Sequence, residues 1–157
     1  MKDIGSLGEA LIARWLEIQN YELLQQNWRC RWGEIDIIAR NEIDNTVAFV
    51  EVKTRSRNNW DENGLLAVDS NKQQKIWKTA SLFLAKYPQF AEFSCRFDVA
   101  LVSYKCLSQP QGIPLRISRQ DAKIDLREMV QLDLGQCVII GQYRLAIESY
   151  LESAFDG

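Results

Sequence analysis

Apolar side chains recur at two different spacings along the chain, and these spacings predict where helices and strands form. An apolar residue at every third or fourth position predicts two helices. They cover residues 5–19 and 70–87. Alternating or continuous apolar runs rich in β-branched and aromatic residues predict strands. These cover residues 21–30, 34–40, 47–54 and 96–104, with further β-rich segments at 115–118 and 137–150.

The order of these elements predicts a single α/β domain over residues 1–157. Its core, residues 5–104, runs α-β-β-β-α-β, which is typical of an α/β sandwich and not of a repeated βαβ array. Residues 105–145 are expected to be a β-rich addition and residues 146–157 a short C-terminal tail. At the helix starts, Ser6 and Ser70 are the expected N-caps.

Composition and charge exclude several classes of function. The 157 residues carry 19 basic and 21 acidic side chains, a net charge of −2, which argues against indiscriminate coating of nucleic acid. The absence of histidine excludes Ser-His and Cys-His nucleophiles. The four cysteines form no CxxC pair, so a zinc site is disfavoured. No segment resembles a signal peptide or membrane span, so we expect a cytoplasmic protein that binds no membrane.

The chemistry is concentrated in a predicted hairpin. In the strand 47–54, both faces are apolar until Glu51, and Lys53 follows on the same face two residues later. If residues 41–46 form the loop, Arg40 faces Val47, and Asp36 then lies directly opposite Glu51. Two carboxylates so close repel each other unless one is protonated or a cation lies between them.

A divalent metal ion resolves this repulsion, because carboxylate oxygens and water suit Mg²⁺ or Mn²⁺. Lys53 would then orient or deprotonate a water activated by the ion, or offset charge developing on a phosphate. The alternative is that Asp36 and Glu51 are rim charges paired with Lys53 or Arg55, since structural ion pairs group the same residues.

Several motifs resemble the YraN-like family, a group of small bacterial proteins in the restriction-endonuclease-like PD-(D/E)XK nuclease superfamily, similar to archaeal Holliday-junction resolvases. The resemblance covers residues 5–104 and resumes at 153–155, and the region 105–145 is longer than the family pattern. The motifs are GE at 8–9, NWRCRWGEIDIIA at 27–39, FVEVKTR at 49–55, VD followed by KQ at 68–73, and RFDV at 96–99.

This resemblance implies a restriction-endonuclease-like core with a mixed central sheet, and Mg²⁺- or Mn²⁺-dependent phosphodiester hydrolysis. It implies catalytic roles for Asp36, Glu51, Lys53 and Glu9. It also implies a metal held by Asp36, Glu51, the backbone carbonyl of Val52 and Glu9. The alternative for Glu9 is a capping box with Ser6, three residues earlier. Related resolvases act as dimers, so a homodimer is a further expectation, although nothing in the chain fixes it.

Basic residues flank the acidic pair and predict a localised nucleic-acid face, with DNA as the expected partner. Between residues 53 and 78 there are six basic and three acidic side chains. The expected nucleic-acid contacts are Arg29, Arg31, Arg55, Arg57, Lys72, Gln73 and Lys75. Such a charge run can also be an ordinary solvated face. Among the tryptophans that could stack on bases, only Trp60 is expected to be accessible.

The sequence therefore favours a metal-dependent nuclease acting on DNA, with branched or single-stranded repair and recombination intermediates as candidate substrates. Two alternatives remain open at this point. One is a non-catalytic module of the same fold that binds DNA or a repair partner. The other is a protein-interaction scaffold that uses residues 105–145 as its partner surface.

Overall fold

A computed structural model describes residues 3–57, 68–107 and 125–155. The expected strand at 115–118 and Trp60 lie outside the described residues. The helices and strands are α1 (Ile4–Ile18), β1 (Tyr21–Cys30), β2 (Gly33–Asn41), β3 (Thr46–Ser56), α2 (Ser70–Lys86), η2 (Pro88–Phe90), β4 (Ser94–Cys106), η5 (Leu126–Glu128), β5 (Cys137–Ile140) and β6 (Tyr143–Leu151). This order confirms the predicted α-β-β-β-α-β series, and β5 and β6 confirm the β-rich segment near the C-terminus.

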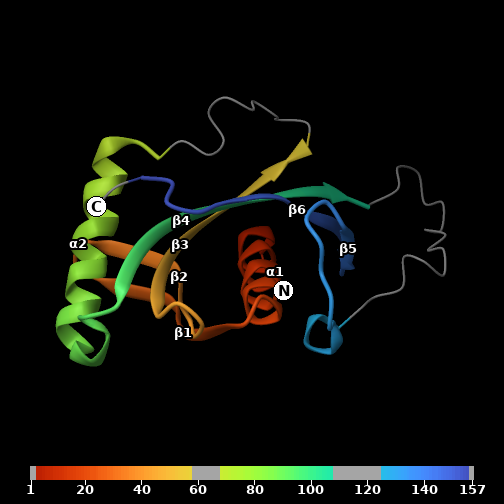
Figure 1. The fold of residues 1–157 in the computed structure, drawn as a ribbon. Helices are drawn as coiled ribbons and strands as arrows, with labels where there is room; N and C mark the ends of the chain where they lie inside the picture. Colours follow the sequence, from red (N-terminus) through yellow and green to blue (C-terminus); the bar gives the residue numbers. More distant parts are fainter. Residues whose placement is uncertain (1–2, 58–67, 108–124, 156–157) are drawn as a thin grey trace.

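The strands form one six-stranded mixed sheet in the order β1-β2-β3-β4-β6-β5. Strands β3 and β4 pair in parallel, and the remaining neighbours pair antiparallel. The two helices lie on opposite faces of this sheet, and Figure 1 shows α1 beneath the curved sheet and α2 beside its other face. Neither helix of the described chain is both long and apolar enough to span a bilayer.

Alternation along β3 divides its side chains between two apolar cores, as the sequence pattern predicts. Ala48 and Val50 pack with α1 and the C-terminal strands. Val47 and Phe49 pack with α2 in a largely aromatic core around Phe83. We call these the α1 core and the α2 core. Because Glu51 follows Phe49 by two residues, its side chain points to the α2 side of the sheet.

The helix starts differ from expectation. Asp3, not Ser6, caps α1, and its carboxylate accepts the Ser6 N–H at 2.8 Å. Asp69, not Ser70, caps α2 and accepts the Lys72 N–H at 2.8 Å. A carboxylate favours this position because it satisfies an unpaired N–H and complements the helix dipole. Glu9 therefore lies beyond the first turn of α1, and the capping-box interpretation of Glu9 is wrong.

Residues 146–151, which the domain division placed in the C-terminal tail, belong to β6, in agreement with the β-rich segment predicted at 137–150. Ala146 and Ile147 are buried, and β6 fills the edge of β4 that would otherwise expose unpaired backbone groups. The chain after β6 is held by Asp98 of β4, whose carboxylate is completely buried.

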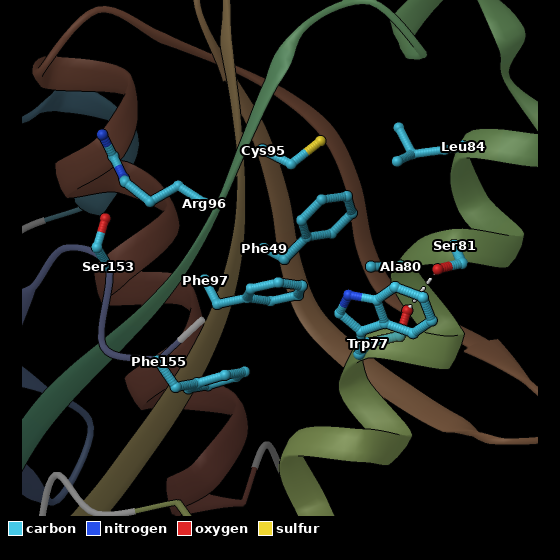
Figure 2. A pocket seen from close by; sticks show the side chains of 10 residues that line it. All are labelled: Phe49, Trp77, Ala80, Ser81, Leu84, Cys95, Arg96, Phe97, Ser153 and Phe155. Carbon is cyan, nitrogen blue, oxygen red and sulfur yellow. Dashed lines mark hydrogen bonds between the residues drawn. The ribbon is translucent and has the colours of Figure 1, made fainter. Parts of the chain in front are cut away.

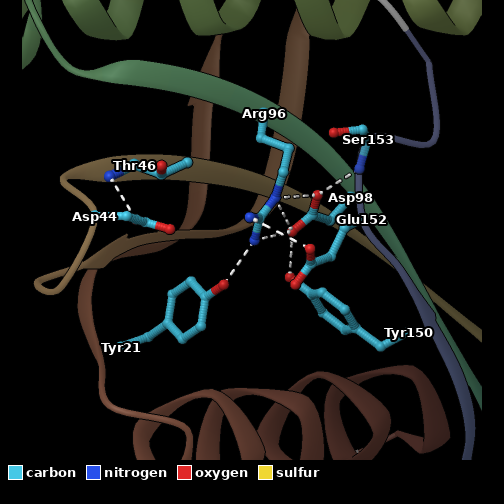
Figure 3. Close-up of polar contacts among 8 residues, drawn as sticks. All are labelled: Tyr21, Asp44, Thr46, Arg96, Asp98, Tyr150, Glu152 and Ser153. Carbon is cyan, nitrogen blue, oxygen red and sulfur yellow. Dashed lines mark hydrogen bonds and ion pairs between the residues drawn. The ribbon is translucent and has the colours of Figure 1, made fainter.

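Asp98 forms the centre of the polar network in Figure 3. Its carboxylate accepts hydrogen bonds from Arg96 at 2.8 Å, from the Tyr150 hydroxyl at 2.6 Å and from the Ser153 backbone N–H at 3.1 Å. Arg96 in turn donates to the hydroxyl of Tyr21 at 2.6 Å. The network links β1, β4 and the C-terminal segment.

We predict that Asp98→Ala lowers the free energy of unfolding by about 3 kcal/mol or more, because it leaves Arg96 buried without its charge partner. Urea denaturation measures the loss. Glu152→Gln is the control, because Glu152 is exposed and its ion pair with Arg96 is long, at 3.6 Å. We expect this variant to lower the free energy of unfolding by less than about 1 kcal/mol. Equal losses in both variants would contradict a buried, tightly coupled Asp98.

Candidate active site

The β2–β3 hairpin brings Asp36 and Glu51 together. Arg40 pairs with Val47, which confirms the predicted register, and the pairing continues to Ile37 opposite Val50. One step further, the Asp36 carboxylate accepts the backbone N–H of Val52 at 2.8 Å. The Asp36 side chain therefore accepts a backbone N–H of β3 just beyond the last backbone pair of the β2–β3 ladder. The carboxylate is thereby fixed against the backbone of β3, next to Glu51.

Asp36 is an unusual acid because it is only 8% exposed and lies among other carboxylates. Burial, and next the charge of Glu51, raise the pKa of Asp36 to about 8, and the charge of Glu9 acts in the same direction. The N–H of Val52 opposes this rise by stabilising the charged form. Near neutral pH, Asp36 therefore holds a proton unless a cation compensates its charge.

Glu9 reaches the same place from α1. Burial raises the pKa of Glu9, while the nearby polar side chains of Asn27 and Asp36 oppose the rise. Gly8 makes this approach of α1 to β3 feasible, because a Cβ on Gly8 would collide with the hydroxyl of Thr54. Glu9 and Glu51 thus each lie close enough to Asp36 to raise its pKa.

Asn27 is a site residue that the sequence analysis did not single out. It lies in β1 with a φ of 51°, in the left-handed region that asparagine tolerates better than most residues. Its side chain lies close enough to Glu9 to oppose the rise in the pKa of that carboxyl. The sequence did place an asparagine in the same motif as the GEID residues. Nothing in the neighbouring sequence indicated that its amide would face α1.

Lys53 and Lys72 supply positive charge on the α2 side of the sheet. The Lys72 ammonium forms an ion pair with the Glu51 carboxylate at 2.6 Å, and the Glu51 side chain is only 13% exposed. Partial burial alone would lower the pKa of Lys72, but the hydrogen bond and charge of Glu51 raise it. Burial and the charge of Arg55 lower the pKa of Lys53. Of the two lysines, Lys53 is therefore the better proton acceptor.

The remaining residues expected to contact nucleic acid are spread around this site, and several already have partners. Arg29 pairs with Glu34 at 2.8 Å and Arg57 with Glu148 at 3.1 Å. The side chain of Gln73 donates to the Val68 carbonyl and that of Arg55 to the Thr54 carbonyl. Lys75 is exposed, and Arg31 lies over the Trp32 ring.

Two cavities flank α2. One, of about 380 Å³, lies beside the Glu51–Lys72 pair and is lined by Gly33, Glu34, Asp69, Lys72, Lys75 and Ile76. The other, of about 300 Å³, lies farther along α2, and Figure 2 shows the rings of Phe49, Phe97, Phe155 and Trp77 around it. Of these two cavities, the first contains charged residues of the candidate site.

The expectation that only Trp60 would be accessible is wrong. Trp77 is 49% exposed and Trp32 is 38% exposed. Trp32 lies in the tight turn between β1 and β2, where its ring contacts the ammonium of Lys78 at 4.4 Å from the ring centre. Trp28 packs edge-on against Phe83 in the α2 core. An aromatic ring with cations around it therefore lies at the surface close to the site.

The acidic side chains fit a hard divalent cation by their chemistry. Mg²⁺ is commonly held by one or two carboxylates and keeps several waters, and Asp36 and Glu51 provide two carboxylates at one place. In the part of the chain that the structure describes, however, no group of three or more Cys, Asp or Glu side chains is arranged to hold a metal ion. Glu51 is instead paired with Lys72.

Comparison with known proteins places this chain among a set of bacterial relatives. The family model described as "Uncharacterised protein family UPF0102" matches residues 8–102. A UPF0102 protein of Synechocystis sp. is 46% identical over 100% of both chains. UPF0102 proteins of Trichodesmium erythraeum and Acaryochloris marina are 40% and 41% identical, covering 98% and 97% of this chain and 88% and 89% of their own.

We predict that Asp36→Asn removes a pH dependence from the stability of the metal-free protein. The pKa of Asp36 in the fold, about 8, is above its value of about 3.9 in an unfolded chain. Folded protein thus binds more protons between these values, and its stability falls as the pH rises from about 4 to 8, by up to about 1.4 kcal/mol per pH unit. Asparagine keeps the acceptor for Val52 but cannot ionise. Denaturation in chelator should show that the stability of the variant relative to the wild type increases as the pH rises. Parallel curves of stability against pH would contradict a buried carboxyl at Asp36.

Proposed function

The chain belongs to the UPF0102 family, and we propose that it is a divalent-metal-dependent nuclease that hydrolyses phosphodiester bonds in DNA. The observation that carries this proposal is the buried carboxyl of Asp36 beside Glu51, which is stable in its charged form only next to a cation. Strained acid pairs of this kind are typical of catalytic sites.

We also propose that residues 5–104 form a restriction-endonuclease-like core within a single domain. Two observations support this: the element order α1-β1-β2-β3-α2-β4, and a central β3 that pairs antiparallel with β2 and in parallel with β4. The acidic residues lie on β2 and β3, and Lys53 lies on β3 two residues beyond Glu51. This core would hold the reacting groups on rigid strands.

In the proposed site, Asp36 and Glu51 would hold Mg²⁺ or Mn²⁺, with Glu9 and the carbonyl of Val52 as further oxygen donors. When bound, such an ion polarises phosphate oxygens and makes water more acidic. Val52 fixes Asp36 in place through its N–H, and Asn27 lies close enough to Glu9 to affect its pKa. The roles of Glu9 and of the Val52 carbonyl as ligands stay predictions.

Lys53 is the proposed proton acceptor. Its lowered pKa increases the share of neutral amine, the form that takes a proton from an attacking water. Protonated, the same group would offset the negative charge that develops on the phosphate. Burial and the charges of Arg55 and Lys72 lower the pKa of Lys53, and the charges of Glu51 and Asp69 oppose them.

The DNA backbone would follow the cavity between the β1–β2 turn and the start of α2. Lys72 and Lys75 line this cavity, and Arg55 is exposed at the end of β3. Trp32, beside Arg31 and Lys78, offers a ring on which an unpaired base could stack. This exposed ring favours branched or single-stranded DNA as substrate over an uninterrupted duplex.

We predict that Asp36→Asn and Lys53→Ala each lower the rate of DNA cleavage at least about 100-fold, because each removes a group from the reacting centre. The measurement is gel-resolved cleavage of forked, nicked, four-way and single-stranded DNA with Mg²⁺ or Mn²⁺. Lys86→Ala, an exposed change at the far end of α2, is the control and should cleave like the wild type.

Wild-type protein that cleaves none of these substrates with either ion would contradict the proposal. If that protein also bound forked DNA with the same affinity in chelator as in Mg²⁺, the non-catalytic binding module would be the correct alternative. Circular dichroism of each variant shows whether lost activity follows from lost folding.

A further inference from the structure

We propose that Lys72 competes with the divalent metal ion for Glu51, and that metal binding frees Lys72 to contact a phosphate of the substrate. This inference rests on the proposed metal site but goes beyond it, because it makes the binding of metal and of DNA interdependent through one side chain. The observation behind it is the 2.6 Å ion pair between the Lys72 ammonium and the Glu51 carboxylate.

The pair occupies the place where a cation is required. Glu51 is a proposed metal ligand, and its side chain is mostly buried, so its carboxylate needs a compensating charge. Lys72 supplies that charge in the metal-free protein. A carboxylate that already accepts a short, charge-assisted hydrogen bond has less affinity for a second cation.

The position of Lys72 also allows its side chain to move away from Glu51. Its side chain is 51% exposed, and it lies in the first turn of α2, whose backbone is fixed by the bond from its N–H to Asp69. The lysine can therefore change rotamer without any movement of the helix. Together with Lys75 it lines the cavity that opens next to Glu51, so the displaced ammonium remains beside the proposed path of the DNA.

The exchange couples the two ligands in both directions. Metal binding at Glu51 releases the Lys72 ammonium, which can then contact the substrate. A phosphate that binds Lys72 likewise removes the competing ammonium from Glu51. By linkage, each ligand then increases the affinity for the other by the same factor. A site built in this way retains little metal in the absence of DNA and fills when both are present.

Calorimetric titration of Mn²⁺ into the full-length protein, without DNA, tests the competition. Lys72→Met keeps the length of the side chain but removes the competing charge, and we expect it to bind Mn²⁺ about 10-fold more tightly than the wild type, the effect of losing one charge-assisted hydrogen bond. Lys75→Met removes the same charge from the next turn of α2 and should change the affinity little. Lys72→Arg, which keeps the charge, should resemble the wild type.

A second measurement follows DNA binding in Ca²⁺ and in chelator at several salt concentrations. In chelator, Lys72→Met should bind forked DNA like the wild type, since Lys72 is then held by Glu51. In Ca²⁺, the wild type should show a salt dependence steeper by about one phosphate contact than the variant. The same difference between the two proteins in both conditions would overturn the coupling.

The outcomes separate this inference from the proposed function. Mn²⁺ binding that is equal in the wild type and Lys72→Met, but lost in Asp36→Asn, would overturn the competition and leave the metal site intact. Equal gains in Lys72→Met and Lys75→Met would also overturn it, because they would show only a general effect of charge. Absence of Mn²⁺ binding in every variant would overturn the metal site itself and the inference with it.

Discussion

The structure of the site depends on one constraint: the carboxyl of Asp36 is held in a nearly buried position next to Glu51. The hydrogen bond from the Val52 N–H fixes it there, and the β2–β3 ladder fixes the strands. Burial and the neighbouring acid destabilise the charged form of Asp36 and so raise its pKa to about 8. A buried acid beside another acid destabilises the fold when it is charged, and this cost is the reason we propose a cation at this position.

The surrounding elements hold this position rigid from several sides. Gly8 allows α1 to pack closely on β3, which brings Glu9 to the acids, and Asp69 starts α2 at the place where Lys72 reaches Glu51. On the far side of β3, Asp98 of β4 ties the C-terminal segment to the sheet. The site is thus built on paired strands and helix starts, which define side-chain positions more precisely than loops.

Local patterns allowed much of this to be predicted from the sequence. Alternation in β3 assigned Phe49 to one face and Val50 to the other, and loop length fixed Arg40 opposite Val47. The helix caps were misplaced by one to three residues because an aspartate upstream of each serine took its role. Local patterns do not report such competition between neighbouring acceptors.

Long-range contacts were not predictable in the same way. Nothing near Lys72 in the sequence shows that it pairs with Glu51, or that Asn27 lies near Glu9, because each pair joins elements that meet only in the folded chain. The pairing of β6 with β4 likewise joins segments that are distant in the sequence. These are also the contacts that give the site its charge balance, so its chemistry is defined by tertiary structure more than by motif spacing.

Anomalous diffraction from crystals grown with Mn²⁺ near pH 8 tests the central claim most directly. We expect an anomalous peak within about 2.3 Å of carboxylate oxygens of both Asp36 and Glu51, with the Lys72 ammonium moved away from Glu51. Crystals that show no peak at these oxygens, and in which Lys72 still pairs with Glu51, would contradict the account.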